Sequence, residues 1–386
     1  MPPYSGICSS VFRQIIVNMA QDKQLNEKTG ASIETPLLSR SECNIMRGLA
    51  IIIIIINNFT HVLRGVFFDS EHSYLWSSVE GFLNNLTHPD ALLPFNIISF
   101  YCPYGVILFI FLSGYGLTLK YEKGNGRGTS ATGFIINHYS KLFTMQLKGL
   151  ALYLVCLFLC FPHYVMDASI ALQALLVGNL NPFQKATPGP YWFFGMIMEM
   201  YVIYRLFIHN RKDSVAIALT VLSLAVMAFA PPEGSLLIYL RTNCFMAIMP
   251  FCMGVLAARH LNRQFLSLDK PLACLGWLLL AFILLTASKF NFFSWLLMPI
   301  FIMGTAVAIV KLMGKVKLLD KAFGWLGAMS GVLFVVHPAI RDILIARVNE
   351  SGAYYSMTCV YLLITFGLSV LLKPLISPKK ENSNKN

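Results

Sequence analysis

The stretch RGLAIIIIIINNFTHVL (Arg47–Leu63) is apolar enough to cross a membrane, yet it carries polar side chains at both ends. An unpaired polar side chain in hydrocarbon costs several kcal/mol, so a simple membrane anchor has no use for them. At ~100° per residue, Asn58 lies ~20° and His61 ~40° from Arg47 around a helix axis, so the three share one face. Along that axis Arg47 and His61 are ~21 Å apart. They cannot both hold the same small group.

Three other apolar segments also contain residues that are capable of chemistry. Ser113 lies in FIFLSGYGLTLKYEK, Glu199 in PGPYWFFGMIMEMYVIYRL and His337 in LGAMSGVLFVVHPAIRDIL. Ionisable side chains inside membrane spans are rare, and they mark substrate, ion or proton pathways. The segments together therefore predict a polar site within the membrane or at its edge.

Each of these residues also has an interpretation without chemistry. Arg47 can anchor the cytoplasmic end of its helix, with its charge among the headgroups, and His61 can cap the outer end. Trp192 can belong to an aromatic belt, and Gly114 to a close helix contact. His337 precedes a proline and can bond a carbonyl group that the proline leaves free.

The composition is that of a membrane protein. Of the 386 residues, 56% are hydrophobic and 12% are charged, whereas soluble domains average roughly 25% charged residues. The net charge of +12 would suggest a nucleic-acid partner in a soluble protein. Here, however, Lys and Arg gather in the short loops between apolar runs, which is typical of cytoplasmic loops. We therefore expect no nucleic-acid partner.

The pattern of the cysteines argues against both a disulfide framework and a metal site. The nine cysteines form no CxxC pair, and most lie inside apolar runs, where cysteine behaves as a small hydrophobic residue. The sequence therefore predicts neither a disulfide framework nor a metal site.

Ten apolar runs predict an all-α polytopic membrane protein. They are Ile45–Val62, Ser99–Lys120, Tyr139–Phe161, Tyr191–Ile208, Ser214–Ala230, Leu236–Ala258, Leu272–Ser288, Phe292–Met313, Phe323–Ile345 and Tyr354–Leu375. An eleventh run, Ala168–Leu180, is short and contains Gln173. Only if it does not span do all the basic loops fall on one side of the membrane. We therefore expect both termini in the cytoplasm, and Ala168–Leu180 as a re-entrant or interfacial segment on the outer side.

The chain divides into three parts. Residues 1–40 are polar and predict a disordered cytoplasmic tail, 41–376 predict one transmembrane domain, and 377–386 predict a short cytoplasmic tail. No remaining stretch is long enough for a separate soluble domain.

The order of the polar segments resembles the acyltransferase 3 family of integral-membrane acyltransferases. Members begin with an Arg-Gly-aliphatic helix that ends in histidine, and continue with a Phe-x-x-Ser-Gly helix. A Trp-Phe span with a tyrosine and a small-Ser-aliphatic-His segment then follow. The matches are Arg47, Gly48 and His61, then Phe109, Phe111, Ser113 and Gly114, then Tyr191, Trp192, Phe193, Glu199 and Tyr201, and finally Met329, Ser330 and His337. The resemblance covers about residues 40–375 and rests on the order of the segments.

Two departures from the family pattern affect the site. Many members place the first histidine eleven residues after the arginine, where this chain has Asn58, whereas His61 comes one turn later on the same face. Either position can therefore be the catalytic one. The arginine-rich entry to the family's third helix is NHYSKLFTMQLKG here, with His138, Lys141 and Lys148. Lysine binds phosphate as a point charge rather than through a bidentate fork.

The resemblance implies an enzyme of the bacterial inner membrane that transfers an acyl group, which we expect to be acetyl, from a cytoplasmic acyl-CoA. The acceptor would be a hydroxyl group on a carbohydrate or glycolipid, and membrane lipid would surround the protein. His61 would be the general base, with Asn58 or His337 orienting it or stabilising the oxyanion. Arg47, Ser113, Lys141 and Trp192 are the expected donor-binding residues. Acetyl-CoA would be a substrate, and no permanently bound cofactor is expected.

Two other classes fit the intramembrane polar residues. A proton-coupled transporter or flippase would use Glu199 and His337 as a proton relay. A structural or sensory membrane subunit would need them only for packing.

Overall fold

The structure is a computed structural model that describes residues 35–161, 169–182 and 188–376. Most of the predicted N-terminal tail and the whole C-terminal tail, residues 1–34 and 377–386, lie outside the described residues. Within them the secondary structure is helical, apart from one isolated bridge between Pro36 and Asn262.

The helices fall into long elements and short turns. The α-helices are α2 (Arg40–Thr60), α3 (Trp76–Thr87), α4 (Leu93–Tyr101), α5 (Gly105–Thr118), α6 (Ala131–Cys160), α7 (Ser169–Ala174), α8 (Trp192–Ile203), α9 (Asp213–Ala228), α10 (Ser235–Thr242), α11 (Cys244–His260), α12 (Pro271–Ser288), α13 (Phe292–Leu296), α14 (Met298–Met313), α15 (Lys317–Ser351) and α16 (Tyr354–Ile376). The 3-10 turns are η2 (Gly178–Leu180), η3 (Gly189–Tyr191) and η5 (Phe265–Ser267), and the π-helical turns are η1 (Leu119–Lys123) and η4 (Tyr204–Ile208).

Helix α2 begins at a capping box and runs through the isoleucines. The Glu42 N–H donates to Ser39 Oγ at 3.2 Å, and the Ser39 N–H donates to Glu42 Oε2 at 2.7 Å. These reciprocal bonds satisfy two backbone donors at the start of the helix. Isoleucine favours strands in water, but in lipid a helix satisfies every backbone group within one segment. The helix ends at Thr60, and the His61 N–H donates to the Asn57 carbonyl oxygen at 3.1 Å.

Each of the ten predicted spans coincides with a helix or a pair of helices, and seven helical segments in the described residues are long and apolar enough to cross a membrane. The seven are Arg40–Thr60, Leu93–Lys123, Ala131–Cys160, Gly189–Ile208, Pro271–Ser288, Lys317–Ser351 and Tyr354–Ile376. Helices α10 and α11 meet at 43° and form an eighth span or a re-entrant segment. In the last two of the ten predicted spans the longest helices are α9 and α14, with 16 residues each. Their length of ~24 Å is less than the ~30 Å thickness of the hydrocarbon core.

The predicted re-entrant segment, Ala168–Leu180, is described from residue 169 onward. It forms the six-residue helix α7 and the turn η2, with Leu176 between them at a φ of 64°. Six helical residues cover only ~9 Å, so α7 cannot cross the membrane. It packs against α6, whereas η2 packs against α8. On which side of the membrane it lies stays a prediction.

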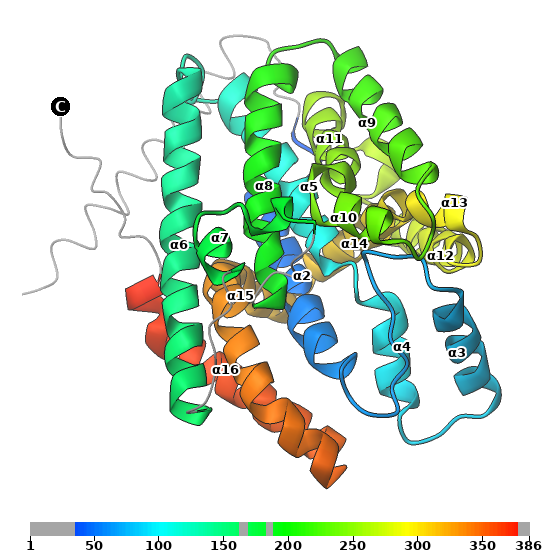
Figure 1. Cartoon of the computed structure of the whole chain (residues 1–386). Coiled ribbons are helices and arrows are strands. Elements are labelled where there is room, and N and C mark those ends of the chain that lie inside the picture. The colour runs from blue at the N-terminus through cyan, green and yellow to red at the C-terminus, as the bar shows by residue number, and fades with distance from the viewer. Residues whose placement is uncertain (1–34, 162–168, 183–187, 377–386) are drawn as a thin grey trace, which may run out of the picture.

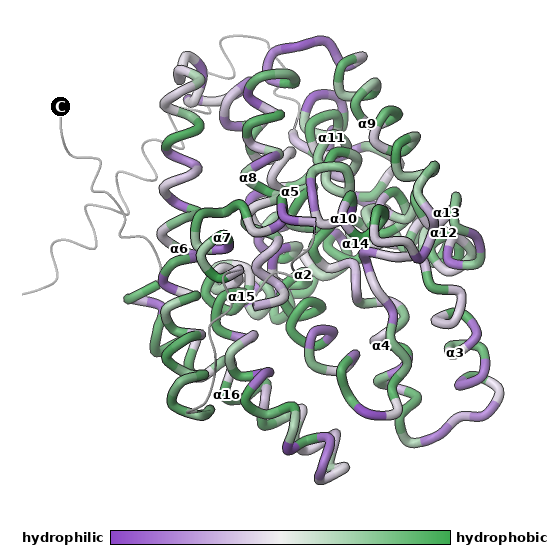
Figure 2. The backbone as a smooth tube through the Cα atoms, viewed as in Figure 1, coloured by the Kyte–Doolittle hydropathy of each residue, from purple (hydrophilic) through white to green (hydrophobic). Residues whose placement is uncertain are grey.

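Helix α2 lies in the middle of the bundle, while α6 and α16 lie at its edge and α3 and α4 extend from one end (Figure 1). In the most apolar window of each span, 56% of α2 and 67% of α15 is buried, against 22–28% of α6, α12 and α16. The last three helices therefore present their apolar side chains to lipid. Hydrophobic residues run along most of the long helices, and many hydrophilic residues lie in the connections (Figure 2).

The contact between α2 and α15 is the most extensive helix contact in the described residues. The two helices approach so closely that a Cβ on Gly48 would lie 2.2 Å from the Phe323 carbonyl oxygen. A Cβ on Gly327 would lie 2.0 Å from the Asn44 carbonyl oxygen. Glycine is therefore required on both sides, as is common where membrane helices touch backbone to backbone.

We expect Gly327→Ala to destabilise the protein, because the clashing atom belongs to the backbone of α2 and cannot rotate away. Overpacking of this kind costs about 1–3 kcal/mol or more. Gly324→Ala is the matched control one turn earlier on α15, since nothing lies within 4 Å of its Cβ position. Thermal unfolding in detergent should show a lower midpoint for Gly327→Ala alone. Equal midpoints would contradict a backbone contact at this position.

Candidate active site

A cavity of about 570 Å³ lies at the end of α2 that carries His61. Its walls come from α2, the α2–α3 connection, α5, the segments around η2 and η3, α8, α10 and α15. The residues that line it are Ile54, Asn57, Asn58, His61, Phe68, Asp69, Ser70, Glu71, His72, Val106, Gly178, Asn179, Asn181, Pro182, Gly189, Pro190, Trp192, Ser235, Ile238, Tyr239, Thr242, Phe334 and Arg341. Most are apolar or neutral, and a few titratable groups converge on the space, as in many small-molecule sites.

His61 is held with one ring nitrogen engaged. Its Nδ1 lies 2.5 Å from the Asn57 carbonyl oxygen, and because a carbonyl oxygen only accepts, Nδ1 must carry the proton. In the neutral ring, Nε2 then has a free lone pair. Burial lowers the pKa of His61, while the Asn57 carbonyl and the Glu71 carboxylate oppose the shift and Arg341 adds to it. The ring is therefore neutral near pH 7 and can accept a proton through Nε2.

The α2–α3 connection brings Glu71 and His72 to the cavity. Arg241 fixes their backbone, since its Nε donates to the Glu71 carbonyl oxygen at 2.5 Å. Burial raises the pKa of the Glu71 carboxyl, and His61 and Arg241 oppose the increase. Burial and the neighbouring Arg241 lower the pKa of His72 to about 3, so His72 is neutral. Its ring packs edge-on against Trp192, with centroids 4.7 Å apart.

A buried ion pair anchors the same connection from behind. Lys289, the residue after α12, bonds Asp69 and the carbonyl oxygen of Phe100, and both charged side chains are buried. The ammonium group also lies 3.8 Å from the centroid of the Phe100 ring. Tyr104 completes the cluster, because its hydroxyl accepts from the Trp295 indole N–H at 3.0 Å. The wall that carries Glu71 is therefore fixed at Asp69 and at Arg241.

Asn58 connects α2 to α15 at the cavity. Its Nδ2 donates to the Ile54 carbonyl oxygen at 2.9 Å, and its Oδ1 lies 3.4 Å from Nη1 of Arg341. Arg341 Nε donates to Asp342 at 2.7 Å, and the Tyr153 hydroxyl on α6 donates to the other carboxylate oxygen of Asp342 at 2.8 Å. The predicted residue Asn58 thus belongs to a chain of polar contacts that joins three helices.

His337 does not line the cavity. It is fully buried on α15, and its Nδ1 donates to the Leu333 carbonyl oxygen at 3.1 Å. Its Nε2 has no partner among the described residues. Phe334 and Arg341, one turn away on either side, do line the cavity, so His337 lies behind its wall.

The remaining predicted residues lie in two places. Trp192 lines the cavity with His61, whereas Arg47, Ser113 and Lys141 lie toward the other end of the bundle. Ser113 and Arg47 both act on Tyr201. The Tyr201 hydroxyl forms a hydrogen bond with the Ser113 side chain, and the charge of Arg47 interacts electrostatically with the same group. Lys141 is exposed on α6, one turn from His138, whose ring centroid lies 4.7 Å from that of Tyr201. Arg47 is exposed and donates to Asn44 Oδ1 at 3.0 Å.

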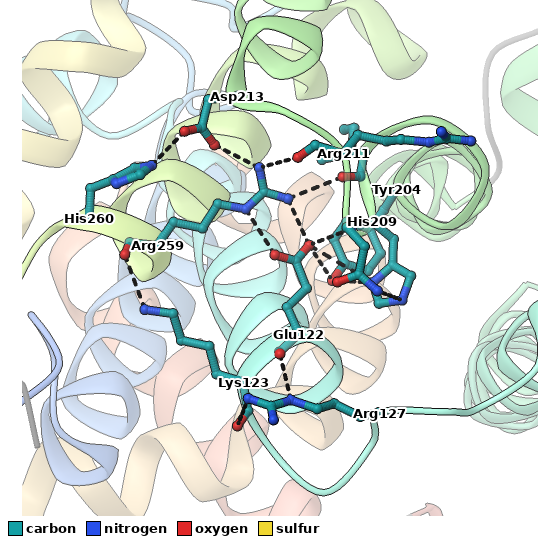
Figure 3. A network of polar contacts seen from close by, with 11 residues as sticks. Glu122, Lys123, Arg127, Tyr204, His209, Arg211, Asp213, Arg259 and His260 are labelled. Carbon is teal, nitrogen blue, oxygen red and sulfur yellow. Dashed lines mark hydrogen bonds and ion pairs between the residues drawn. The ribbon is translucent and has the colours of Figure 1, made fainter. Parts of the chain in front are cut away.

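A separate ionic network is centred on Arg259, which lies between Glu122 and Asp213 (Figure 3). Arg259 binds Glu122 with two nitrogens, each at 2.8 Å, and Asp213 with the third at 2.7 Å. Both Arg259 and Glu122 are largely buried. His260 adds a contact to Asp213 at 2.7 Å. The network ties η1, α9 and α11 together, so the Arg259 charge is neutralised and is not available for a phosphate group.

Glu199 has a structural partner at the break between α10 and α11. Its Oε2 accepts from the Cys244 N–H at 2.9 Å, the first backbone donor of α11, and its Oε1 accepts from Asn179 Nδ2. Asn179 in turn donates to Asn243 Oδ1 at 2.6 Å. A carboxylate at the start of a helix stabilises the free N–H groups there. Glu199 therefore caps a bent helix pair.

Several cavity residues were not predicted from the sequence. Asp69, Glu71 and His72 stand within the short segment FFDSEHSY that follows His61, and two acids with a histidine so close to a candidate base are the signal that could have identified them. Arg241 could not have been found, because nothing in SLLIYLRT shows which backbone it will bind. Among the described residues, no group of three or more His, Cys, Asp or Glu side chains could hold a metal ion.

One comparison with known proteins identifies a relationship. A family model described as an acyltransferase domain matches residues 40–374, nearly all of the described chain. No curated protein and no solved structure matches the chain.

We expect Lys289→Met to destabilise the protein by on the order of 3–5 kcal/mol, because it leaves the Asp69 carboxylate buried without its partner. The double variant Asp69→Asn with Lys289→Met should recover much of the loss, since neither charge then remains. Lys321→Met on the exposed surface of α15 is the control. Thermal midpoints of the unmodified protein, Asp69→Asn, Lys289→Met and the double variant form a double-mutant cycle. Additive effects would show that the two side chains do not interact.

Proposed function

The chain belongs to the acyltransferase 3 family of integral-membrane acyltransferases, and from that premise we propose that it transfers an acetyl group from acetyl-CoA to a hydroxyl group of a carbohydrate or glycolipid acceptor. The observation that carries the proposal is His61, whose Nδ1 is bonded to backbone and whose ring lines a cavity of about 570 Å³. A neutral histidine with a free Nε2 is the residue that a hydroxyl acceptor needs as its general base.

The donor would bind with its phosphates at the Arg47 end of the bundle. Arg47 and Lys141 are exposed there, and their charges are not used by the Arg259 network. Ser113 and Tyr201 lie beside Arg47 and offer hydroxyl groups to the same ligand. Along α2 the distance from Arg47 to His61 is ~21 Å, so an extended thioester arm would run along the α2 face toward the cavity.

The reaction in the cavity would be a direct acyl transfer. His61 Nε2 takes the proton of the acceptor hydroxyl as its oxygen attacks the thioester carbonyl carbon. The C–S bond then breaks, and the departing thiolate takes the proton from the imidazolium. Glu71 lowers the free energy of that transient imidazolium, because its carboxylate acts on His61 across the same cavity. Asn58 and Trp192 would position the reacting groups.

The acceptor would enter from the open side of the cavity. Phe68 and Ile238 are exposed there, and Tyr239 and Asn181 offer polar groups beside them. Such a mixture of apolar faces and neutral polar groups suits a sugar hydroxyl better than an anion. We propose a bacterial inner membrane with both termini in the cytoplasm, so that the His61 side faces outward, as the basic loops favour.

The two residues on which the transporter alternative depends, Glu199 and His337, both have structural partners. It required Glu199 as a proton carrier, but Glu199 accepts bonds from Cys244 and Asn179 at a helix break. His337 bonds a backbone carbonyl within its own helix. Both residues therefore have partners that explain them as parts of the fold.

We expect purified protein in lipid to release free CoA from acetyl-CoA, faster when an acceptor sugar is present, and His61→Ala to lower that rate about 10²–10⁴-fold. The double change Asn58→His with His61→Asn tests whether the base must stand at the level of residue 61, since it moves the imidazole ring one turn deeper along the same face of α2. His88→Ala, an exposed histidine outside the cavity, is the control. Full activity of His61→Ala would exclude His61 as the base, and His337 would become the candidate.

The pH dependence of the rate should reveal the charge of Glu71. The Glu71 carboxylate raises the pKa of His61, so Glu71→Gln should lower it. Because the base works only when neutral, the acid limb of the kcat profile should then shift to lower pH. Arg341 remains in both proteins and acts in the opposite direction on His61, while Arg241 and Asp69 act on Glu71. An unchanged acid limb would mean that Glu71 does not act on the base.

A further inference from the structure

Arg341 is a permanent cation of the cavity. Among the described residues that line the cavity, Arg341 alone is a lysine or an arginine. Two other cations of this region are engaged elsewhere, since Lys289 is buried and paired with Asp69, and Arg241 is buried and donates to the Glu71 carbonyl oxygen. Arg341 is itself only 15% exposed, so its charge acts in a space with little water. A charge in such surroundings interacts much more strongly than one in bulk water.

The guanidinium of Arg341 is held by Asp342 of its own helix and by Asn58 of α2, and Tyr153 of α6 supports Asp342. Its Nε donates to Asp342 Oδ1 at 2.7 Å, and the Tyr153 hydroxyl of α6 holds Asp342 at 2.8 Å from the other side. Its Nη1 lies 3.4 Å from Asn58 Oδ1 on α2. Because a guanidinium is planar, these contacts fix its orientation as well as its position.

Part of the guanidinium is unused. It has five N–H donors, and the contacts to Asp342 and Asn58 occupy two of them. Within residues 35–161, 169–182 and 188–376, Nη2 makes no hydrogen bond. A pre-arranged cation that lines a cavity and keeps free N–H donors is suited to an anionic oxygen.

The position of Arg341 relative to His61 indicates which anionic oxygen Arg341 would bind. Arg341 contacts Asn58, and His61 follows Asn58 by three residues on the same face of α2. The cation and the base therefore line neighbouring parts of the cavity. When the base has delivered the acceptor oxygen to the thioester carbon, the carbonyl oxygen becomes negatively charged, and it needs a hydrogen-bond donor close by.

We propose that Arg341 is a catalytic residue that binds the oxyanion of the tetrahedral intermediate through its free N–H groups. The inference rests on the proposed acyl transfer. In that step, the acceptor O–H proton passes to His61 Nε2, the new C–O bond forms, and the carbonyl π electrons move to the oxygen that faces Arg341. When these electrons form the carbonyl double bond again, the C–S bond breaks and the thiolate leaves with the proton of His61. Asp342 and Tyr153 are positioning residues, since Asp342 contacts the guanidinium and Tyr153 contacts Asp342.

The test compares Arg341→Gln and Arg341→Lys in the full-length protein in lipid, with acetyl-CoA as donor. Both hydrolysis of the thioester in the absence of an acceptor and transfer to an acceptor sugar are measured, because both pass through an oxyanion. We expect kcat of Arg341→Gln to fall about 10²–10³-fold in both reactions, with little change in either KM. Arg341→Lys should keep part of the rate, since it retains the charge without the fork. Arg347→Gln, an exposed arginine on the same helix, is the matched control.

Added guanidinium ion gives an independent readout. In Arg341→Ala, millimolar guanidinium should raise kcat severalfold by entering the vacated space, and it should not do so in His61→Ala. A purely structural role would instead lower the thermal midpoint and leave no rescue. If Arg341→Gln does not fold, Arg341→Lys and the rescue of Arg341→Ala decide the question.

Three outcomes would overturn the inference. If hydrolysis is unchanged while the acceptor KM rises, Arg341 binds the acceptor. If neither rate changes, it has no role in the chemistry. If the unmodified protein neither hydrolyses nor transfers acetyl groups, the proposed function itself fails and the inference fails with it, whereas the first two outcomes leave the proposed function intact.

Discussion

The rest of the site depends on the backbone contact between α2 and α15. Gly48 and Gly327 let the two helices touch backbone to backbone in the first half of each helix. Farther along, Asn58 meets Arg341, and Asn349 meets Val62, two residues beyond the end of α2. The two helices therefore run in the same direction. The glycine contact sets their separation, so a single bulky residue there would also disturb the contact between Asn58 and Arg341 at the cavity.

The polar residues around the cavity have little freedom because their partners are already in place. His61 is bonded to its own backbone, and Asp69 is paired with a buried lysine. In a medium with few water molecules, a charge that loses its partner cannot be compensated by solvent. The cost of breaking these contacts keeps the cavity in one arrangement before any substrate arrives, which is the condition for electrostatic catalysis.

The helices could be predicted from the sequence because hydropathy is a local property. The ten apolar runs each formed a helix or a pair of helices, and the capping box at Ser39 follows directly from its residue types. A 16-residue helix such as α9 is too short to be identified as a membrane span from its own residues. Whether it crosses the membrane also depends on the segments that lie at its two ends. The bend between α10 and α11 depends on Glu199, which comes more than forty residues earlier.

The site was predicted in part for the same reason. The spacing of Arg47, Asn58 and His61 fixes their common face by helix geometry alone. The partners of His61 come from the connection that follows it and from a helix nearly 300 residues away. Glu71 stands in the local segment FFDSEHSY, whereas no local pattern shows that Arg341 will reach His61. His337 illustrates the converse, because its residue type inside a span favours chemistry, whereas its ring is fully buried and bonded to the Leu333 carbonyl oxygen.

Helix α15 is longer than a membrane requires. Its 35 residues correspond to ~52 Å, against a hydrocarbon core of ~30 Å, and Arg341 lies ~36 Å from its first residue. If α15 starts at one face of the bilayer, Arg341 and the cavity beside it stand at the level of the opposite headgroups, although the Arg341 side chain itself is only 15% exposed. Under the proposed function, an acceptor would then give up water only around the hydroxyl group that reacts. A long acceptor would enter the cavity one hydroxyl group at a time while the rest of it stays in the aqueous phase.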